Sequence, residues 1–394
     1  MQRRHDLDWV RVLAFGLLVL YHVGMYYVSW DWHVKSPFAS PALEPLMFLT
    51  SPWRLSLLFL ISGVALAHLL NARPERLLRT RSWRLLVPLL FGMIVVVTPQ
   101  AYYEVIEKAP GGFNDGYLAF WSRYLAGDPT FCREGECLDL PTWNHLWFVV
   151  YLWVYTMVVV GSVRAFPRIS AKVGNLLARQ LEGVGLLLWP AAALAVARLA
   201  LVGTFESTHA LVDDWYNHAQ YLGVFALGFL LGQRAPLWDA MRARRHIALA
   251  IALVSYLAWT AYAISFAELE PPTALRMAMR LVWSLNQWTA IVAILGYARH
   301  FAPGDSPALR YLSQAVFPVY ILHQTVIVVL AHEAQPLGLH PAVEGPLLVL
   351  ATFTACFAGY EVIRRITWLR PLFGLKAREP RATHQASQLA SGAA

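Results

Sequence analysis

Three ionisable residues lie in or just before the first apolar run of the chain, at spacings that could support chemistry: Asp8, Arg11 and His22. Eleven residues of α-helix return almost to the starting azimuth, so Arg11 and His22 share one helix face, about 16 Å apart along the axis. Asp8 lies on the same face, three residues before Arg11, where the two side chains can pair. A helix over this run therefore presents a polar column, with an imidazole at its far end that could act as a general base near neutral pH.

Two more histidines accompany other apolar runs, His323 within Tyr320-Ile321-Leu322-His323 and His145 at the start of His145-Leu146-Trp147-Phe148. An ionisable side chain inside a membrane is unfavourable unless it faces a cavity or a partner, which makes such residues functional candidates. The alternative for His22 is a core histidine bonded to a backbone carbonyl, and for His145 an interfacial aromatic belt. His323 weakens the first alternative, because it lies about as deep in its own run as His22.

A pair of arginines precedes the third apolar run. Arg81 and Arg84 are three residues apart at the start of a predicted helix, where two guanidinium groups can form a fork suited to phosphate oxygens. The alternative is ordinary positive charge at the cytoplasmic edge of a membrane helix.

The composition places these residues in a membrane protein. Of the 394 residues 58% are hydrophobic and only 14% are charged, and the mean hydropathy is +0.47. The 16 Trp and 17 Tyr residues suit the headgroup zone, where one end of a ring is apolar and the other is wet. The formal charge of +8 does not indicate nucleic-acid binding, because the charges follow the membrane pattern.

The apolar runs predict an all-α, polytopic fold with about ten membrane spans. Each run is long enough to cross about 30 Å of hydrocarbon. They cover residues 10–28, 53–72, 85–104, 145–163, 184–203, 218–233, 247–266, 277–298, 312–331 and 343–362.

The basic residues predict the orientation of these spans. With the N-terminus inside, most of the 32 Lys and Arg residues fall on the cytoplasmic side. The outer side holds only Lys35, Arg54, Lys108, Arg123, Arg133, Arg276 and Arg280, and Arg11 and Arg198 are left within spans. The positive-inside rule therefore predicts that both termini are cytoplasmic. We expect a single membrane domain over residues 1–375 and a disordered cytoplasmic tail over 376–394.

Two outer connections are long, residues 29–52 and 105–144, and long connections often carry function. The first contains Trp32 and His33. The second contains Cys132 and Cys137, which could form a short-loop disulfide if this side of the membrane is oxidising.

Taken together, these segments resemble the acyltransferase 3 family of membrane acyltransferases. Its hallmarks occur here in order: Arg11 with His22, Leu60-Ile61-Ser62-Gly63-Val64, Arg81-Ser82-Trp83-Arg84, His145-Leu146-Trp147-Phe148 and Tyr320-Ile321-Leu322-His323. Within the family the chain looks most like the glucan biosynthesis protein C group, which succinylates osmoregulated periplasmic glucans. That narrower likeness depends on Trp32-His33-Val34-Lys35-Ser36, Ser62-Gly63, Arg84 with Pro88, and Pro99-Gln100.

The resemblance implies an acyl-CoA donor, carrying a succinyl or acetyl group, that enters from the cytoplasm. Its phosphates would bind Arg81 and Arg84, and its pantetheine arm would pass Arg11. His22 would be the general base. Asp8 would orient or neutralise Arg11 and would not act as a base itself, because it lies about 21 Å along the helix from His22. Further candidates for contact with the substrate or its oxyanion are His145, Trp147, His323, Trp32 and His33.

The resemblance also implies the setting of the reaction. We expect a multi-pass protein of the bacterial inner membrane, in contact with lipids and with a glycan acceptor on the periplasmic side. A homodimer is compatible with the sequence. We expect neither nucleic acid nor metal as a partner, since the histidines lack a ligand spacing such as H-E-x-x-H. Two alternatives remain at this point: an acyltransferase for O-antigen, capsule or another small acceptor, and a proton-coupled secondary transporter.

Overall fold

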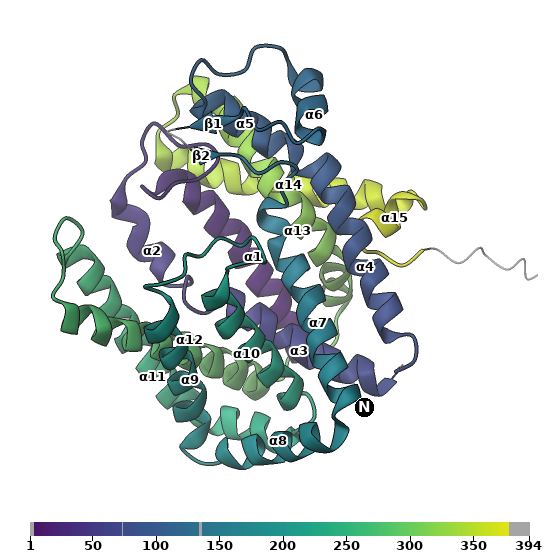
Figure 1. Ribbon diagram of the computed structural model, residues 1–394, viewed down its shortest axis with the longest axis vertical. Helices are drawn as coiled ribbons and strands as arrows, with labels where there is room; N and C mark the ends of the chain where they lie inside the picture. The colour runs from purple at the N-terminus through teal and green to yellow at the C-terminus, as the bar shows by residue number, and fades with distance from the viewer. Residues whose placement is uncertain (1–3, 73, 134–135, 378–394) are drawn as a thin grey trace, which may run out of the picture.

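The computed structural model describes residues 4–72, 74–133 and 136–377, and almost all of its regular structure is helical (Figure 1). The α-helices are α1 His5–Tyr27, α2 Glu44–Phe48, α3 Arg54–Ala72, α4 Leu77–Phe91, α5 Thr98–Lys108, α6 Tyr117–Leu125, α7 Trp147–Ala165, α8 Pro167–Gln180, α9 Gly185–Leu201, α10 Trp215–Leu231, α11 Ala235–Ser265, α12 Thr273–Phe301, α13 Pro307–Ala334, α14 Pro341–Arg365 and α15 Leu369–Leu372. Short 3₁₀ turns cover Pro41–Leu43 (η1), Asn144–Leu146 (η3) and Gln335–Leu337 (η4), and a π-helical turn covers Gly92–Val96 (η2). Strands β1 Cys132–Arg133 and β2 Glu136–Cys137 pair as one antiparallel hairpin.

Each predicted apolar run coincides with helix in the structure, which confirms the all-α membrane fold. Within the described residues, eight helical segments are long and apolar enough to cross a membrane, or up to nine if the bent pair of α8 and α9 is one span. Helix α10, on the sixth predicted run, has only 17 residues. The number of ten crossings and the cytoplasmic termini stay predictions. The predicted tail at 376–394 lies outside the described residues from 378 onward.

Helix α1, which carries the polar column, lies in the middle of the molecule (Figure 1). It packs against α13, α12, α3 and α14. The other extensive contacts are between α11 and α12, α10 and α3, α12 and α9, and α4 and α7. The residues of α1 are therefore surrounded by helices from distant parts of the chain.

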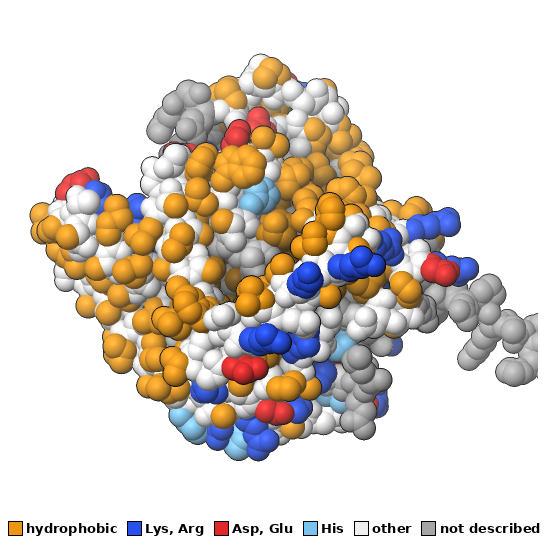
Figure 2. Space-filling model, turned by 60° about the horizontal axis from the view of Figure 1, so that its bottom comes forward, with side chains coloured by type: hydrophobic (Ala, Val, Ile, Leu, Met, Phe, Trp, Pro, Cys, Tyr) orange, Lys and Arg blue, Asp and Glu red, His pale blue; other side chains and the backbone are white. Residues whose placement is uncertain are grey.

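The outer surface of the bundle is apolar over its flanks. Figure 2 shows hydrophobic side chains there and Lys and Arg side chains gathered toward the lower part of the molecule. Large hydrophobic side chains are exposed on several long helices, among them Leu188 and Val196 of α9, Leu253 and Leu257 of α11, and Leu347 and Leu350 of α14. Such a surface suits contact with lipid chains.

The third predicted span begins earlier than expected and is interrupted. Helix α4 starts at Leu77, so Arg81 and Arg84 lie in its first turns, ahead of the predicted apolar run. Pro88 lies within α4, and the π-helical turn η2 separates α4 from α5. A proline ring and a π-turn both disturb the regular hydrogen-bond ladder of a helix. The segment continues as α5, which carries Gln100 and Glu104, and Leu77–Lys108 together is one candidate span.

Helices α3 and α10 pack with their backbones almost in contact at two glycines. A Cβ atom on Gly63 would lie 2.0 Å from the carbonyl oxygen of Phe225, and one on Gly228 would lie 2.1 Å from that of Leu60. No side chain fits at these positions. The glycine in Leu60-Ile61-Ser62-Gly63-Val64 thus has a packing role, as small residues commonly have between membrane helices.

We expect Gly228→Ala to destabilise the protein, because its methyl group must push α10 away from α3. Overpacking of this kind costs about 1–3 kcal/mol. The matched control is Gly223→Ala in the same helix, where an added Cβ meets nothing within 4 Å. Thermal unfolding in detergent should show a lower midpoint for Gly228→Ala and an unchanged or higher one for Gly223→Ala. Equal midpoints would contradict the close packing of the two backbones.

Candidate active site

Two of the predicted histidines meet in the core of the bundle. Nδ1 of His22, on α1, lies 2.8 Å from Nε2 of His323, on α13. Their rings are stacked, with centroids 4.9 Å apart. His323 is fully buried, whereas His22 keeps part of its surface accessible. The two imidazoles at matching depth are therefore direct partners.

The contacts of His323 determine where the protons lie. Nδ1 of His323 is 2.6 Å from the carbonyl oxygen of Tyr320, which can only accept, so this nitrogen carries the hydrogen. Nε2 of neutral His323 then accepts a hydrogen bond, and Nδ1–H of His22 must donate it. This leaves the lone pair of neutral His22 on Nε2, for which no hydrogen-bond partner occurs among the described residues. His323 thus has the role of the third residue of a catalytic triad, which orients the base and fixes its tautomer.

His145 also contacts His323, with its ring edge-on and the two centroids 5.2 Å apart. Its Nε2–H donates to the carbonyl oxygen of Ile321 at 3.1 Å, and its Nδ1 accepts from Nε2 of Gln100 at 3.3 Å. The hydroxyl of Tyr320 donates to the backbone oxygen of His145 at 2.5 Å. Both ring nitrogens of this buried residue are therefore engaged, and His145 ties the start of α7 to α13.

A chain of side-chain hydrogen bonds extends this network toward the first long outer connection. Nε2 of Gln324 donates to Oε1 of Gln100 at 3.1 Å and to Nε2 of His33 at 2.8 Å. Nδ1–H of His33 donates in turn to Oε2 of Glu104 at 2.5 Å. Each donor in this chain has an acceptor, so the network is satisfied and rigid. His33, which was expected to contact substrate, lies between Gln324 and Glu104 in this network.

The two predicted tryptophans are largely covered. Trp147 stacks on the ring of His209 at 4.1 Å between centroids, and burial lowers the pKa of His209. Trp32 packs in a core cluster with Tyr26 and Val34. Both tryptophans are buried, so they support the walls of the site in this conformation.

The predicted arginines cluster at the other end of α1. The expected pair is present, with Nη2 of Arg11 3.4 Å from Oδ1 of Asp8. The charges of Arg84 and Arg11 both act on Arg81, whose Nε is buried without a hydrogen-bond partner. Arg84 donates from Nε and Nη2 to the carbonyl oxygen of Gly374, at 3.4 and 3.2 Å. This concentration of positive charge is suited to an anion.

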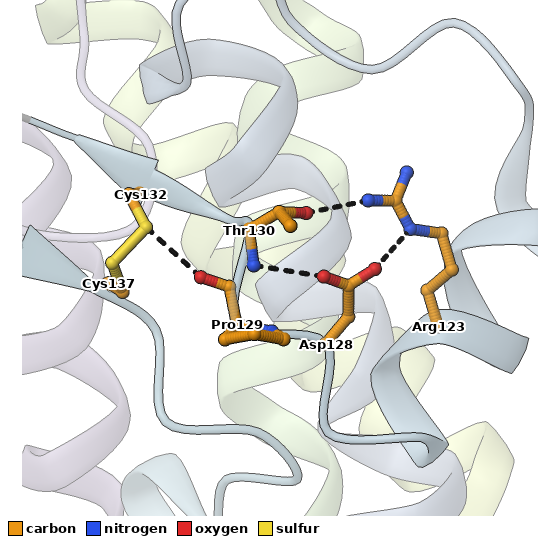
Figure 3. The surroundings of a disulfide bond; sticks show 6 residues. All are labelled: Arg123, Asp128, Pro129, Thr130, Cys132 and Cys137. Carbon is orange, nitrogen blue, oxygen red and sulfur yellow. Dashed lines mark hydrogen bonds and ion pairs between the residues drawn. A yellow bond between two sulfur atoms is a disulfide. The ribbon is translucent and has the colours of Figure 1, made fainter.

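The second long outer connection is built around the expected cysteine pair. Cys132 and Cys137 form a disulfide across β1 and β2 (Figure 3). Beside it, Arg123 bridges Oδ2 of Asp128 at 2.6 Å and Oγ1 of Thr130 at 2.7 Å. The hydrogen bonds from Arg123 and Thr130 lower the pKa of Asp128 to about 2. The loop is thus held by a covalent bond and a charged hydrogen-bond cluster.

Several residues of the network did not stand out in the sequence as site candidates. They are Gln100, Glu104, Asn144, Gln324 and Thr325. The sequence feature that could have identified most of them is an amide or hydroxyl side chain inside or next to an apolar run. Within the described residues, no three His, Cys, Asp or Glu side chains are placed to hold a metal ion together.

The chain matches known proteins over most of its length. Residues 4–361 match the family described as an acyltransferase domain. A relative named "Glucans biosynthesis protein C" from Salmonella gallinarum is 24% identical over 334 residues, which cover 82% of this chain and 81% of the relative. A protein of the same name from Escherichia coli is 27% identical over 177 residues, 44% of this chain and 42% of that protein. No solved structure matches the chain at a significant level. With its apolar helices and a family match from residue 4 to residue 361, the chain belongs to the acyltransferase 3 family and is a membrane acyltransferase.

Proposed function

We propose that this acyltransferase moves a succinyl or acetyl group from cytoplasmic acyl-CoA to a hydroxyl of a glycan outside the membrane, most specifically an osmoregulated periplasmic glucan. The observation that carries the proposal is the His22–His323 pair, which leaves Nε2 of His22 as a base with an accessible ring. The names of the two relatives support a glucan as acceptor. Family membership removes the secondary transporter as an alternative.

In the proposed reaction, Nε2 of His22 takes the proton of a sugar hydroxyl while that oxygen bonds to the thioester carbonyl carbon. The tetrahedral adduct collapses as its carbon–sulfur bond breaks. The CoA thiolate leaves and takes the proton from His22. The products are the sugar ester and free CoA, and His22 returns to its neutral form. Direct transfer of this kind requires no acyl-enzyme.

His323 and His145 act in this proposal as positioning residues. Both nitrogens of each ring have partners, so neither ring has a free donor for the oxyanion. His323 holds Nδ1–H of His22 and thereby presents Nε2 to the substrate. His145 braces the segment of α13 that carries His323.

The donor enters, in this proposal, from the end of α1 that carries Arg11. Arg81 and Arg84 bind the phosphates of CoA, and the pantetheine arm runs along the face of α1 toward His22. Arg11 and His22 lie about 16 Å apart along the axis, a distance that an extended pantetheine arm can span. We place the enzyme in the bacterial inner membrane, with both termini in the cytoplasm.

The proposed function is tested with purified protein in detergent. It is incubated with acetyl-, succinyl- and longer acyl-CoA together with a periplasmic glycan extract, and free CoA and product mass are followed. We expect CoA release that depends on the glycan, and a glycan that gains the mass of one acyl group. O-antigen, capsule and small-molecule acceptors in parallel reactions test the alternative acceptors. Absence of CoA release with every donor and acceptor would contradict the proposal.

Replacing His323 tests its positioning role. His323→Leu leaves Nδ1–H of His22 without its acceptor, and an unsatisfied buried donor costs about 1–3 kcal/mol. We expect a loss of roughly 10- to 100-fold in kcat with little change in KM for the donor. His323→Gln offers an amide oxygen in its place and should recover part of the rate. Equal losses in the two variants would show that the hydrogen bond to His22 is not the reason.

A further inference from the structure

A buried arginine lies next to the His22–His323 pair. Arg54 is the first residue of α3 and is only 4% exposed, and it lies over the ring of Tyr21, whose centroid is 6.1 Å from that of the His22 ring. Its guanidinium carbon is 3.5 Å from the ring centroid of Tyr21, and its Nη1 donates to Oγ1 of Thr50 at 3.0 Å. The sequence had placed this residue among the basic residues outside the membrane.

The positive charge of Arg54 lacks a matching negative charge. Nε is buried without a hydrogen-bond partner, and within the described ranges no carboxylate lies within ion-pair distance of the guanidinium. The group that lies against the guanidinium is the uncharged ring of Tyr21. A cation–π contact offsets only part of the desolvation penalty of a buried ion. The pocket is therefore suited to receive an anion.

The position of Arg54 indicates which part of a substrate would supply that anion. In the proposed function the donor arrives past Arg11, and its thioester carbonyl reaches His22. The distal end of the acyl group then lies beyond the thioester, on the side away from Arg11. A guanidinium beside His22 can meet a group a few bonds beyond the reacting carbonyl. A carboxylate there would accept two parallel hydrogen bonds from a planar guanidinium.

We infer that Arg54 binds the free carboxylate of a dicarboxylic acyl group and so selects acyl donors that end in a negative charge. The inference rests on the proposed function, since it takes His22 as the reaction centre. It assigns the buried site of Arg54 and Tyr21 to the distal end of the acyl chain. Within the range of donors in the proposed function, it favours succinyl over neutral acyl groups.

The test compares succinyl-CoA with butyryl-CoA, which has the same four-carbon length without the carboxylate. For the wild type, we expect a higher kcat/KM with succinyl-CoA. Arg54→Gln should lower kcat/KM for succinyl-CoA roughly 30-fold, the effect of losing a charge-assisted contact. The value for butyryl-CoA should change less than about 3-fold. Arg54→Lys keeps the positive charge but cannot donate two parallel hydrogen bonds. Its kcat/KM for succinyl-CoA should lie between those of the wild type and Arg54→Gln.

Arg198→Gln is the matched control. Arg198 is another arginine held by aromatic rings, 4.4 Å from the ring of Trp283 and bonded to the hydroxyl of Tyr216 at 2.7 Å. It lies on α9, outside the proposed site, so its loss should leave the succinyl-to-butyryl ratio unchanged. The ratio keeps the test informative where a variant is less stable, because partial unfolding lowers both rates equally.

Three results would overturn the inference. One is a wild type that uses both donors equally well. Another is a parallel loss for both donors in Arg54→Gln and Arg54→Lys, which would assign Arg54 to the reacting carbonyl or to packing. The third is a wild type that releases CoA from neither donor while binding CoA, which would overturn the proposed function first and this inference with it.

Discussion

Replacing His22 with glutamine is expected to lower acyl transfer by roughly 100- to 10,000-fold, the usual contribution of a positioned general base. Glutamine can still donate a hydrogen bond to Nε2 of His323, which is 2.8 Å from Nδ1 of His22 in the structure. It cannot take a proton from a sugar hydroxyl. The variant should therefore fold and bind donor like the wild type and fail in the chemical step. CoA release under saturating donor measures the loss.

Two further measurements separate this role from a structural one. The wild-type rate should rise with pH through the titration of one group, and the residual rate of His22→Gln should lack that dependence. His246→Gln is the control, because this histidine bonds to the hydroxyl of Tyr297 at an exposed site away from the pair. It should leave the rate unchanged. Full activity in His22→Gln would remove the imidazole from the mechanism.

Removing both arginines of the predicted phosphate fork is expected to weaken donor binding by roughly 100- to 1,000-fold, since each charge-assisted contact is worth about 1.5–3 kcal/mol before screening. The double variant Arg81→Gln with Arg84→Gln leaves helix α4 intact, because glutamine is a good helix former. Titration of purified protein with CoA at low ionic strength measures the dissociation constant. The affinity of the wild type should fall with added salt more steeply than that of the variant.

The two arginines should not contribute equally. Arg84 already donates to the carbonyl oxygen of Gly374, whereas Nε of Arg81 is buried without a hydrogen-bond partner. Arg81→Gln alone should therefore account for most of the loss. Arg79→Gln, an exposed position on the same helix, controls for the change in net charge and should have a small effect. An unchanged dissociation constant in the double variant would refute the phosphate assignment.

Much of the fold could be predicted from the sequence because membrane helices follow a local rule. A run of apolar residues of sufficient length forms a helix whatever its neighbours, since lipid offers no hydrogen bonds to an open backbone. The spacing of Asp8, Arg11 and His22 likewise depends only on helical periodicity, and the Asp8–Arg11 contact is present at 3.4 Å. Helix boundaries were less predictable. Charged residues do not end a helix, so α4 begins at Leu77 and not near residue 85.

The candidate site depends on contacts that no local pattern contains. His22 and His323 are 301 positions apart, and the azimuths of α1 and α13 determine that their rings meet. Gln100 and His145 are 45 positions apart and meet because α5 packs beside the start of α7. Arg54 was predicted as an outer charge because its burial comes from neighbouring helices.

By itself, the sequence determined which segments are helical and which residues share one helix face, because both properties arise from interactions within a few residues. Only the tertiary structure decided which faces meet, which nitrogen of each histidine carries the proton, and which arginine is buried without a counter-charge. These depend on packing between helices far apart in the chain. A hydrogen bond or a desolvated charge exists only once that packing has placed its partners or excluded water.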